Sequence, residues 1–566
     1  MATLAAQIAR PSPPAQPQQG LALTYHRLML VMFLFVGVTF VIVARLTQLQ
    51  LFTDRAGSAL SVNPLLPPRG DIVDRNGLPL ARTFDGWTIA VRPGDVIGDK
   101  SELARRLAEL VPGHSAQQYF AMLNDRRRPF IYIARSAVPE TVQAVNALGE
   151  PGIVFDREPR RLYPQTVLAG HVLGWVDRDG HGASGMEQAL EAQLSDPARR
   201  GQPVALSIDS RAQAVLETEL ATAVSAMQAE GGTGIVMDVQ TGEIIAMASA
   251  PTFNPNAAGR SDANSLYNRA TMGVYEFGST FKPITVAAAM EARVVTSMQQ
   301  RWDATAPIAI GRYQISDDHP LNRMINIPEL MVHSSNIGTA RIADAMGPAR
   351  MQAAFRALGF DRPPVIELRE RTRPLFPSDW GRATVMTSGF GHGLAITPLH
   401  LASAYAALVN GGVFRPATLL KVPEGRAIPG RQVYSEATSY RIRQLLRLNV
   451  QQGTGRRGEA AGFRVGGKTG TGEKAMAGGY NRQLNVSTFA AAFPMDAPRY
   501  VVIVMMDAPR PTEANSFVTT AAFTAAPIVS RVIAAIGPLL NVIPSDSRDI
   551  DTAELMPPLA ATTPEH

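Results

Sequence analysis

The chain has 566 residues, which at about 150 residues per domain is enough for three or four structural units and a large hydrophobic core. Hydrophobic residues make up 46% of the chain and charged residues 18%, which excludes both a disordered acidic protein and a protein with many membrane spans. The formal net charge is +6, and the absence of cysteine excludes disulfides, cysteine nucleophiles and thiolate metal sites.

The first segment has the pattern of a tail followed by a membrane anchor. Residues 1–27 are rich in proline and glutamine and contain no acidic side chain, which predicts a disordered basic tail. The next 17 residues, 28–44, are uncharged, and as a helix they would span about 25 Å. We expect a transmembrane anchor over residues 28–45 rather than a signal peptide, because no small-residue cleavage site follows. The basic residues before it predict a cytoplasmic N-terminus.

Residues 46–203 predict an elongated α+β segment without a clear catalytic cluster. Strand-like runs at 87–91 and 130–133 alternate with polar helical pieces and with turns rich in proline and glycine. From residue 204 the chain is richer in alanine and in long apolar runs, which predicts a second domain over 204–540. Residues 541–566 are polar and contain proline, so we expect a disordered tail there.

The second domain predicts an antiparallel sheet covered by helices. Ser210 and Gln213 resemble a capping box, and apolar residues at helical spacing follow as far as Met227. A last helix is predicted over 519–536, interrupted at Pro527. Four apolar runs have the composition of strands, the first two forming a hairpin: 234–238, 243–249, 486–493 and 500–506.

Lysine is rare in this chain, and two lysines lie in motifs that suggest chemistry. Only five of the 54 cationic residues are lysines: Lys100, Lys282, Lys421, Lys468 and Lys474. Unlike arginine, a buried lysine readily loses its proton. Ser279-Thr280-Phe281-Lys282 places a serine at a predicted helix N-terminus with a lysine one turn later on the same face. This spacing suits a serine nucleophile with lysine as its base.

Two further motifs follow in order. Ser334-Ser335-Asn336 begins 55 residues after Ser279, and Lys468-Thr469-Gly470-Thr471 begins another 134 residues later. Each motif alone is weak, as the isolated Ser61-Val62-Asn63 illustrates. Together and in this order they are typical of serine acyltransferases related to penicillin-binding proteins and β-lactamases.

Other segments make the resemblance specific. Residues 67–77, 234–243 and 275–283 resemble the matching segments of class B penicillin-binding proteins, and the likeness extends over about residues 25–540. The pedestal and residues 333–338 resemble the division-specific (FtsI-type) transpeptidase more than the elongation-specific one. The implied fold is α+β: a membrane helix, an elongated pedestal (46–203), and a transpeptidase domain with a helix-covered antiparallel sheet. Gly472-Glu473-Lys474 departs from the small residue expected after the third motif.

The resemblance implies catalytic roles for the first two motifs. Ser279 would attack the D-Ala-D-Ala peptide bond of a peptidoglycan stem peptide, with Lys282 as its base. Ser334 would relay a proton to the departing D-Ala, and Asn336 would bind the donor peptide or Lys282.

The third motif is implied to bind substrate through Lys468, Thr469, Gly470 and Thr471. Lys468, with Thr469 and Thr471, would attract the terminal carboxylate, and Lys468 would also favour the neutral form of Lys282. The backbone N–H groups of Ser279 and Thr471 would stabilise the oxyanion. No metal or cofactor is implied.

The resemblance also implies partners and location. The substrates would be stem peptides and a lipid-linked precursor, with cross-linking to an acceptor amine of a neighbouring stem peptide. β-Lactams would block Ser279. A SEDS-family glycosyltransferase and other division proteins would be partners at the inner membrane, and no nucleic acid is expected.

Other functions are compatible with part of this pattern. An elongation-specific transpeptidase, a D,D-carboxypeptidase or a β-lactamase would carry the same motifs, although the anchor and pedestal argue against a simple hydrolase. A bifunctional enzyme would need a polymerase domain before residue 204, and the Glu-Asp pair that begins its motif is absent from 46–203. A non-catalytic scaffold would tolerate Ser279→Ala.

A phosphate-binding loop is the main rival for the third motif. Residues 462–469 match Gly-x4-Gly-Lys-Thr, and the apolar run 501–507 ends in an aspartate of the kind that holds magnesium. Such a loop should follow a strand and open a helix. Residues 451–461 are polar, and Gly470 and Gly472 disfavour a helix, so we set nucleotide binding aside.

Other polar residues are assigned structural roles. His333, His392 and His400 lack metal-ligand spacing and are predicted to line the pocket or to pack. The run 126–128 of three arginines is predicted to be a solvated loop, and the Arg69-Gly70-Asp71 tripeptide is predicted to form ion pairs rather than an adhesion site.

Overall fold

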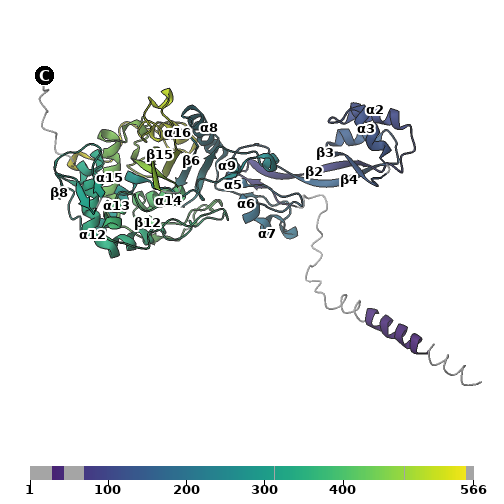
Figure 1. The fold of residues 1–566 in the computed structure, drawn as a ribbon, viewed down its shortest axis with the longest axis horizontal. Helices are drawn as coiled ribbons and strands as arrows, with labels where there is room; N and C mark the ends of the chain where they lie inside the picture. Colours follow the sequence, from purple (N-terminus) through teal and green to yellow (C-terminus); the bar gives the residue numbers. More distant parts are fainter. Residues whose placement is uncertain are drawn as a thin grey trace, which may run out of the picture. The chain divides into compact units, whose positions relative to one another are not determined.

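The computed structural model describes residues 29–43 and 69–555, apart from 126, 312, 427 and 477–478. The chain divides into two compact units, Met1–Asn63 and Pro64–His566. In the first unit residues 29–43 form a helix with exposed apolar side chains, drawn in purple in Figure 1. No helix among the described residues is both long and apolar enough to cross a membrane. The predicted tail (1–27) and the ends of the predicted anchor lie outside the described residues.

The N-terminal part of the second unit is built on one long strand, β2 (Pro79–Val91), which pairs antiparallel with β4 (Ile153–Leu162), β3 (Ile131–Ala137) and β1 (Ile72–Val73). β5 (Val204–Ala205) adds to β1 in parallel. Helices α2 (Lys100–Leu110), α3 (Ala116–Asn124) and α4 (Pro139–Asn146) contribute to its apolar core. The strands predicted around 87–91 and 130–133 are confirmed.

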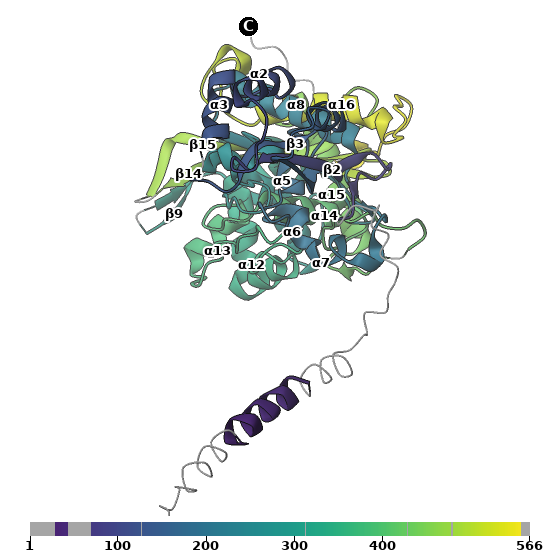
Figure 2. The same ribbon diagram turned by 90° about the vertical axis from the view of Figure 1, so that its right-hand side faces the viewer.

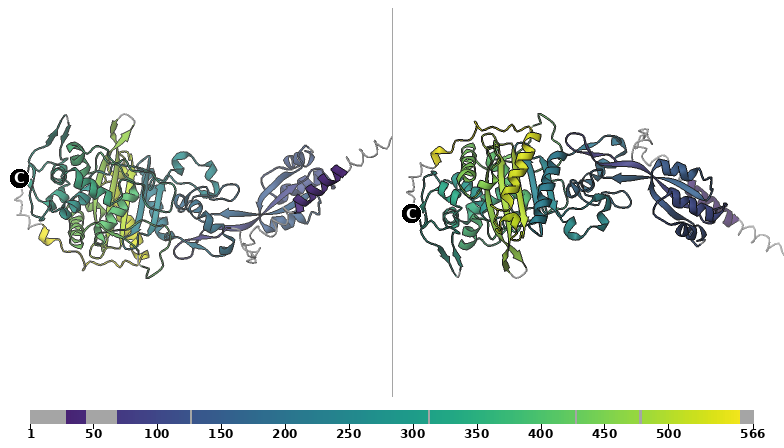
Figure 3. Two further views of the ribbon diagram at one scale, coloured as in Figure 1. Left: turned by 90° about the horizontal axis from the view of Figure 1, so that it is seen from below. Right: turned by 90° about the horizontal axis from the view of Figure 1, so that it is seen from above.

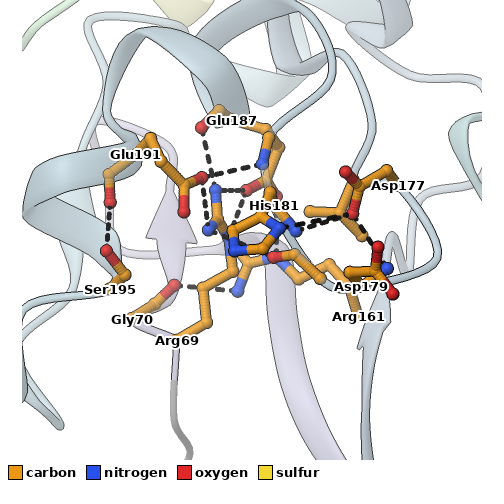
Figure 4. A network of polar contacts seen from close by, with 12 residues as sticks. Arg69, Gly70, Arg161, Asp177, Asp179, His181, Glu187, Glu191 and Ser195 are labelled. Carbon is orange, nitrogen blue, oxygen red and sulfur yellow. Dashed lines mark hydrogen bonds and ion pairs between the residues drawn. The ribbon is translucent and has the colours of Figure 1, made fainter.

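A buried ion-pair cluster joins the segment before β1 and β4 to the short helices α6 (Gly185–Ala189) and α7 (Glu191–Leu194). Arg69 pairs with Glu187 at 2.7 Å and with Glu191 at 2.8 Å, and Arg161 pairs with Glu187 at 2.6 Å (Figure 4). Because the Glu187 side chain is fully buried, the two arginines compensate its charge. The ion-pairing role predicted for Arg69 is confirmed.

The C-terminal part contains the predicted antiparallel sheet, with strand order β14-β15-β16-β6-β7. Its strands are β14 (Gly466–Met476), β15 (Gly479–Phe493), β16 (Tyr500–Asp507), β6 (Gly231–Asp238) and β7 (Ile244–Ala250). One row across the sheet aligns Lys468, Ala490, Ile503, Ile235 and Met247. The last four of these belong to one buried cluster and the next row belongs to another, so alternate residues enter two cores.

The core that this next row enters lies under α8 (Ser210–Ala226) and α16 (Ala525–Leu539), which pack on each other and on the same side of the sheet (Figures 1 and 2). Two predicted details are wrong. Asp209 rather than Ser210 caps α8, and Gln213 bonds the backbone of Met247 instead of closing a capping box. α16 begins at Ala525, so Pro527 lies in its first turn, where a missing N–H costs little, and does not interrupt the helix.

The core that contains Ala490, Ile503, Ile235 and Met247 fills the opposite side of the sheet, as the layers in Figure 3 show. Helices that contribute to it include α10 (Lys282–Glu291), α11 (Ile327–His333), α12 (Asn336–Ala357), α13 (Arg382–Gly389), α14 (Pro398–Val409) and α15 (Glu436–Gln452). Four short strands flank α12 as two hairpin-like pairs: β8 (Trp302–Ala304) with β11 (Arg323–Ile325), and β9 (Ile308–Ile310) with β10 (Tyr313–Ile315). The α+β class and the helix-covered antiparallel sheet are confirmed.

The start of the predicted C-terminal tail is ordered. Asp549 pairs with Arg447 of α15 at 2.7 Å, and Leu555 is 1% exposed. The prediction of disorder is therefore wrong for residues 541–555, because polar composition did not reveal the arginines of α15 that bind this segment. Residues 556–566 lie outside the described part.

Candidate active site

Ser279 lies in a short 3-10 helix, η3 (Gly278–Phe281), that runs directly into α10. Gly278 adopts φ +52°, and a Cβ there would lie 2.6 Å from the carbonyl oxygen of Thr471. Glycine is therefore required for the turn that presents Ser279 beside β14. The prediction of a serine at a helix start is confirmed, with the lysine as the first residue of α10.

Lys282 connects the first motif to the second. Its side chain is fully buried, and Nζ donates to Ser279 Oγ at 2.9 Å, to Ser334 Oγ at 2.9 Å and to Asn336 Oδ1 at 2.8 Å. Nζ also donates to the carbonyl oxygen of Ser334. One amine thus contacts three of the predicted site residues.

The second motif forms the junction between α11 and α12. Ser334 ends α11 in the left-handed conformation, φ +56°, and Ser335 caps α12 by accepting from Gly338 N at 3.0 Å. Ser334 Oγ donates to Ser279 Oγ at 3.1 Å. The turn between the two helices therefore directs Ser334 and Asn336 toward Lys282 while Ser335 faces away.

The third motif lies within β14, an edge strand, although its glycines did not suggest a strand. The Lys468 side chain is fully buried on the side of the sheet that carries α10. Its Nζ donates to Ser334 Oγ at 3.0 Å and to Thr454 Oγ1 at 3.3 Å. Thr469 Oγ1 donates to the same Thr454 oxygen at 2.7 Å.

Close backbone contact holds β14 against η3. A Cβ on Gly470 would lie 2.2 Å from Phe277 O, and one on Gly472 would lie 2.0 Å from Glu276 O. These contacts require glycine at both positions and bring Thr471 beside Gly278, next to the nucleophile. Lys474, where the sequence departs from the expected pattern, pairs at 2.6 Å with Asp507 at the end of β16, two strands away in the sheet order.

The electrostatic environment disfavours protonation of both lysines. Burial lowers the pKa of Lys282 to about 7, against the opposing effect of Asp317 and Asp318. Burial also lowers the pKa of Lys468 well below its usual value, and the nearby Lys282 lowers it further. Burial and the closeness of the two amines, which share Ser334 Oγ, therefore disfavour the state in which both are charged. A neutral Lys282 can accept the proton of Ser279.

All eight predicted site residues meet in one region, since Ser279, Lys282, Ser334, Asn336 and Lys468 share hydrogen bonds and residues 469–471 continue along β14. Two family models match the chain. "Penicillin binding protein transpeptidase domain" covers residues 232–529, and "Penicillin-binding Protein dimerisation domain" covers residues 64–204. The chain belongs to the class B penicillin-binding proteins.

Named relatives agree with this penicillin-binding protein family. A probable peptidoglycan D,D-transpeptidase FtsI of Caulobacter vibrioides is 41% identical, with 84% of this chain and 82% of the relative covered. The peptidoglycan D,D-transpeptidase FtsI of Escherichia coli is 29% identical over 80% of this chain and 81% of its own length. Penicillin binding protein 3 of Mycobacterium tuberculosis, solved with aztreonam, aligns with TM-score 0.66 at 25% identity, covering 86% of this chain and 99% of that one.

Three polar neighbours of the site in this penicillin-binding protein escaped the sequence analysis. Thr454 contacts Lys468 and Thr469, and Asn449 donates to Gly467 O at 2.8 Å, which anchors the start of β14 to α15. Asp317 accepts from Ser335 Oγ at 2.7 Å. Thr454 lies between two glycines after a helix and Asp317 lies in an acidic pair, so neither has a local signal that distinguishes it from a turn residue.

Of the three histidines singled out from the sequence of this penicillin-binding protein, His400 is buried, His392 is partly buried and His333 is exposed, so the packing role holds for His400 and not for His333. His400 bonds Thr397 Oγ1 at 2.8 Å and Arg362 O at 3.0 Å at the start of α14. His392 is close enough to Lys282 to be affected by it, and burial lowers the pKa of His392 to about 4. His333 ends α11 and is exposed. The described residues contain no cluster of histidine and acidic side chains that could hold a metal ion.

The nucleotide-binding alternative has no structural support in this penicillin-binding protein. Residues 462–469 are preceded by α15 and the short η4 (Arg456–Gly458), and Lys468 and Thr469 lie inside a strand. A phosphate-binding loop would instead present its backbone N–H groups at the start of a helix.

The run of three arginines at 126–128 is described only in part. The Arg128 guanidinium lies 3.6 Å from the Asp125 carboxylate and is exposed, while Arg126 lies outside the described residues.

Proposed function

We propose that this chain is an FtsI-type peptidoglycan D,D-transpeptidase that acts through a Ser279 acyl-enzyme. The observation that carries the proposal is the single hydrogen-bonded cluster of Ser279, Lys282, Ser334 and Lys468. It occurs in a chain 41% identical to a probable peptidoglycan D,D-transpeptidase FtsI.

Acylation begins when neutral Lys282 takes the proton of Ser279 Oγ, 2.9 Å away. The oxygen attacks the carbonyl carbon of the donor's D-Ala-D-Ala bond, a C–O bond forms, and the C–N bond breaks. Ser334 contacts both Ser279 and Lys468, so it can pass a proton to the departing D-Ala amine.

The negative charge of the donor peptide would be balanced by residues of β14. The donor's terminal carboxylate would lie near Lys468 with Thr469 and Thr471, and its negative charge would raise the pKa of Lys468 again. The oxyanion would be bound by the backbone N–H groups of Ser279 and Thr471, each worth about 3 kcal/mol. Gly470 allows this strand to approach η3 closely.

The acyl group is then transferred to an amine of a neighbouring stem peptide. The C–O ester breaks, an amide forms, and Ser279 recovers its proton. A D,D-carboxypeptidase or β-lactamase would use water instead, and an elongation-specific transpeptidase would use the same chemistry elsewhere in the wall. A β-lactam is attacked in the same way as the donor and leaves Ser279 acylated.

The cellular setting is also proposed. Residues 28–45 would anchor the chain in the inner membrane behind a cytoplasmic tail (1–27), with the pedestal (46–203) and transpeptidase domain (204–540) in the periplasm. A lipid-linked precursor and a SEDS-family glycosyltransferase of the division machinery would supply the glycan strands, because the dimerisation and transpeptidase matches include no polymerase.

Release of D-Ala from a pentapeptide stem, with and without an added acceptor amine, tests the proposal. Wild type is expected to release D-Ala and to form the amide-linked dimer when the acceptor is present. Ser279→Ala should do neither, whereas Ser225→Ala, on the exposed side of α8, should behave as wild type. D-Ala release without dimer at high acceptor concentration would favour the carboxypeptidase.

A further inference from the structure

A buried carboxylate outside the three motifs holds the second motif in place. Asp317 follows β10 and is 8% exposed. Its Oδ2 accepts from Ser335 Oγ at 2.7 Å, and its Oδ1 accepts from Ile337 N at 2.9 Å. The carbonyl oxygen of the preceding Ser316 accepts from Asn336 Nδ2 at 3.0 Å. Two adjacent residues thus bind three consecutive residues of the turn between α11 and α12.

These bonds determine which way the motif points. Ser335 Oγ donates to Asp317 and accepts from Gly338 N, so both of its hydrogen-bonding directions are fixed. A carboxylate at the first turn of α12 also interacts favourably with the helix N-terminus. Asp317 binds Ser335 and Ile337. The side chains of Asn336, between them, and of Ser334, before them, are hydrogen-bonded to Lys282 instead.

We propose that Asp317 is a positioning residue for acylation, one that orients Ser334 and Asn336 on Lys282 by binding Ser335 and the start of α12. This inference rests on the proposed function of Ser279 and Lys282, and it adds a residue that touches neither the substrate nor the nucleophile. Bonds to a charged acceptor are stronger than neutral ones, so the carboxylate form is the one that holds the turn.

The same carboxylate contributes to the charge around Lys282. Asp317 and Asp318 favour the protonated amine, whereas Lys468 on β14 carries like charge when protonated. His392, in the turn after α13, is close enough to Lys282 to be affected by its charge but is neutral near pH 7, since burial lowers the pKa of His392 to about 4. Neutralising either aspartate should therefore shift the acid limb of the acylation profile to lower pH, while only Asp317 also supports the turn.

The test compares Asp317→Asn, Asp317→Glu and Asp318→Asn by their rate of acylation by a fluorescent penicillin across the neutral pH range. The plateau rate of Asp317→Asn is expected to fall about 100-fold, the loss typical of reacting groups displaced by roughly 1 Å. Asp317→Glu keeps the charge and should recover part of that loss. Asp318→Asn removes a neighbouring exposed charge without these hydrogen bonds, and its plateau should stay far closer to wild type.

The outcomes separate this inference from the proposed function. A plateau in Asp317→Asn equal to that in Asp318→Asn overturns the positioning role, even if both profiles shift. If Asp317→Asn fails to fold by circular dichroism, Ser335→Ala, which removes only the hydroxyl that donates to Asp317, is measured instead. Wild-type acylation by that variant also overturns it. Failure of the proposed function would appear as undiminished labelling of Ser279→Ala, a result that does not depend on Asp317.

Discussion

Gly470→Ala is expected to separate the nucleophile from the strand that binds substrate. Gly470 lies in β14 opposite η3, and an added Cβ would lie 2.2 Å from Phe277 O, 2.7 Å from Thr280 Cγ2 and 3.0 Å from Thr280 N. Two of these atoms are backbone and cannot turn aside as a flexible side chain would. The strand must therefore withdraw from η3.

The size of the effect follows from these distances. Restoring an ordinary contact of 3.4 Å requires a movement of about 1 Å, which also displaces Lys468 and Thr471 from Ser279. A displacement of this size costs roughly 100-fold in rate when reacting groups are involved. Overpacking of this kind should lower the free energy of unfolding by about 1–3 kcal/mol, which leaves the protein folded.

Stopped-flow acylation by a fluorescent penicillin and urea unfolding measure the two effects separately. Gly259→Ala is the matched control, because a Cβ there meets nothing within 4 Å. Acylation of Gly470→Ala at the wild-type rate, in a protein of reduced stability, would refute the account of β14 as a strand held against the nucleophile.

Three other predictions concern charge. Because burial lowers the pKa of Lys282 to about 7, acylation should decline as the pH falls through about 7, and Lys282→Arg should abolish it; a flat profile in this range would contradict the role of Lys282 as base. Glu187→Gln should lower the free energy of unfolding in urea by about 3–5 kcal/mol, since it removes the buried carboxylate that Arg69 and Arg161 share and leaves Arg69 with Glu191 as its ion-pair partner. Asp549→Ala should cost about 1–3 kcal/mol in the same assay by removing a partner of the nearly buried Arg447, and no change would contradict a packed C-terminal segment.

The elements with strong local patterns were predictable from sequence. The hairpin of β6 and β7, residues 486–493 of β15, and β16 are apolar runs, and α8 and α10 have helical apolar spacing, whereas the first half of β15 is polar and was not predicted. Among the site residues, Ser279, Lys282 and Ser334 were predictable because their spacing reflects a helix start and a fixed chain order.

Other features depend on tertiary contacts that leave no local pattern. β14 is rich in glycine and has weak strand propensity, and it is a strand because its glycines fit against η3 and because β15 pairs with it. The cap of α8 was assigned to Ser210, one residue late, since Asp209 and Ser210 are both good caps by composition. Asp317 binds the start of α12, although β11 and α11 separate the two in the chain. The segment 541–555 is ordered by contacts with Arg447, about a hundred residues earlier in the chain.

The central claim is that Ser279 is the acylated nucleophile, and labelling with a fluorescent penicillin tests it most directly. Wild type should form a stable adduct that peptide mapping by mass spectrometry assigns to Ser279, and Ser279→Ala should remain unlabelled at the same protein concentration. Undiminished labelling of Ser279→Ala, or an adduct mapped to another residue, would contradict the account.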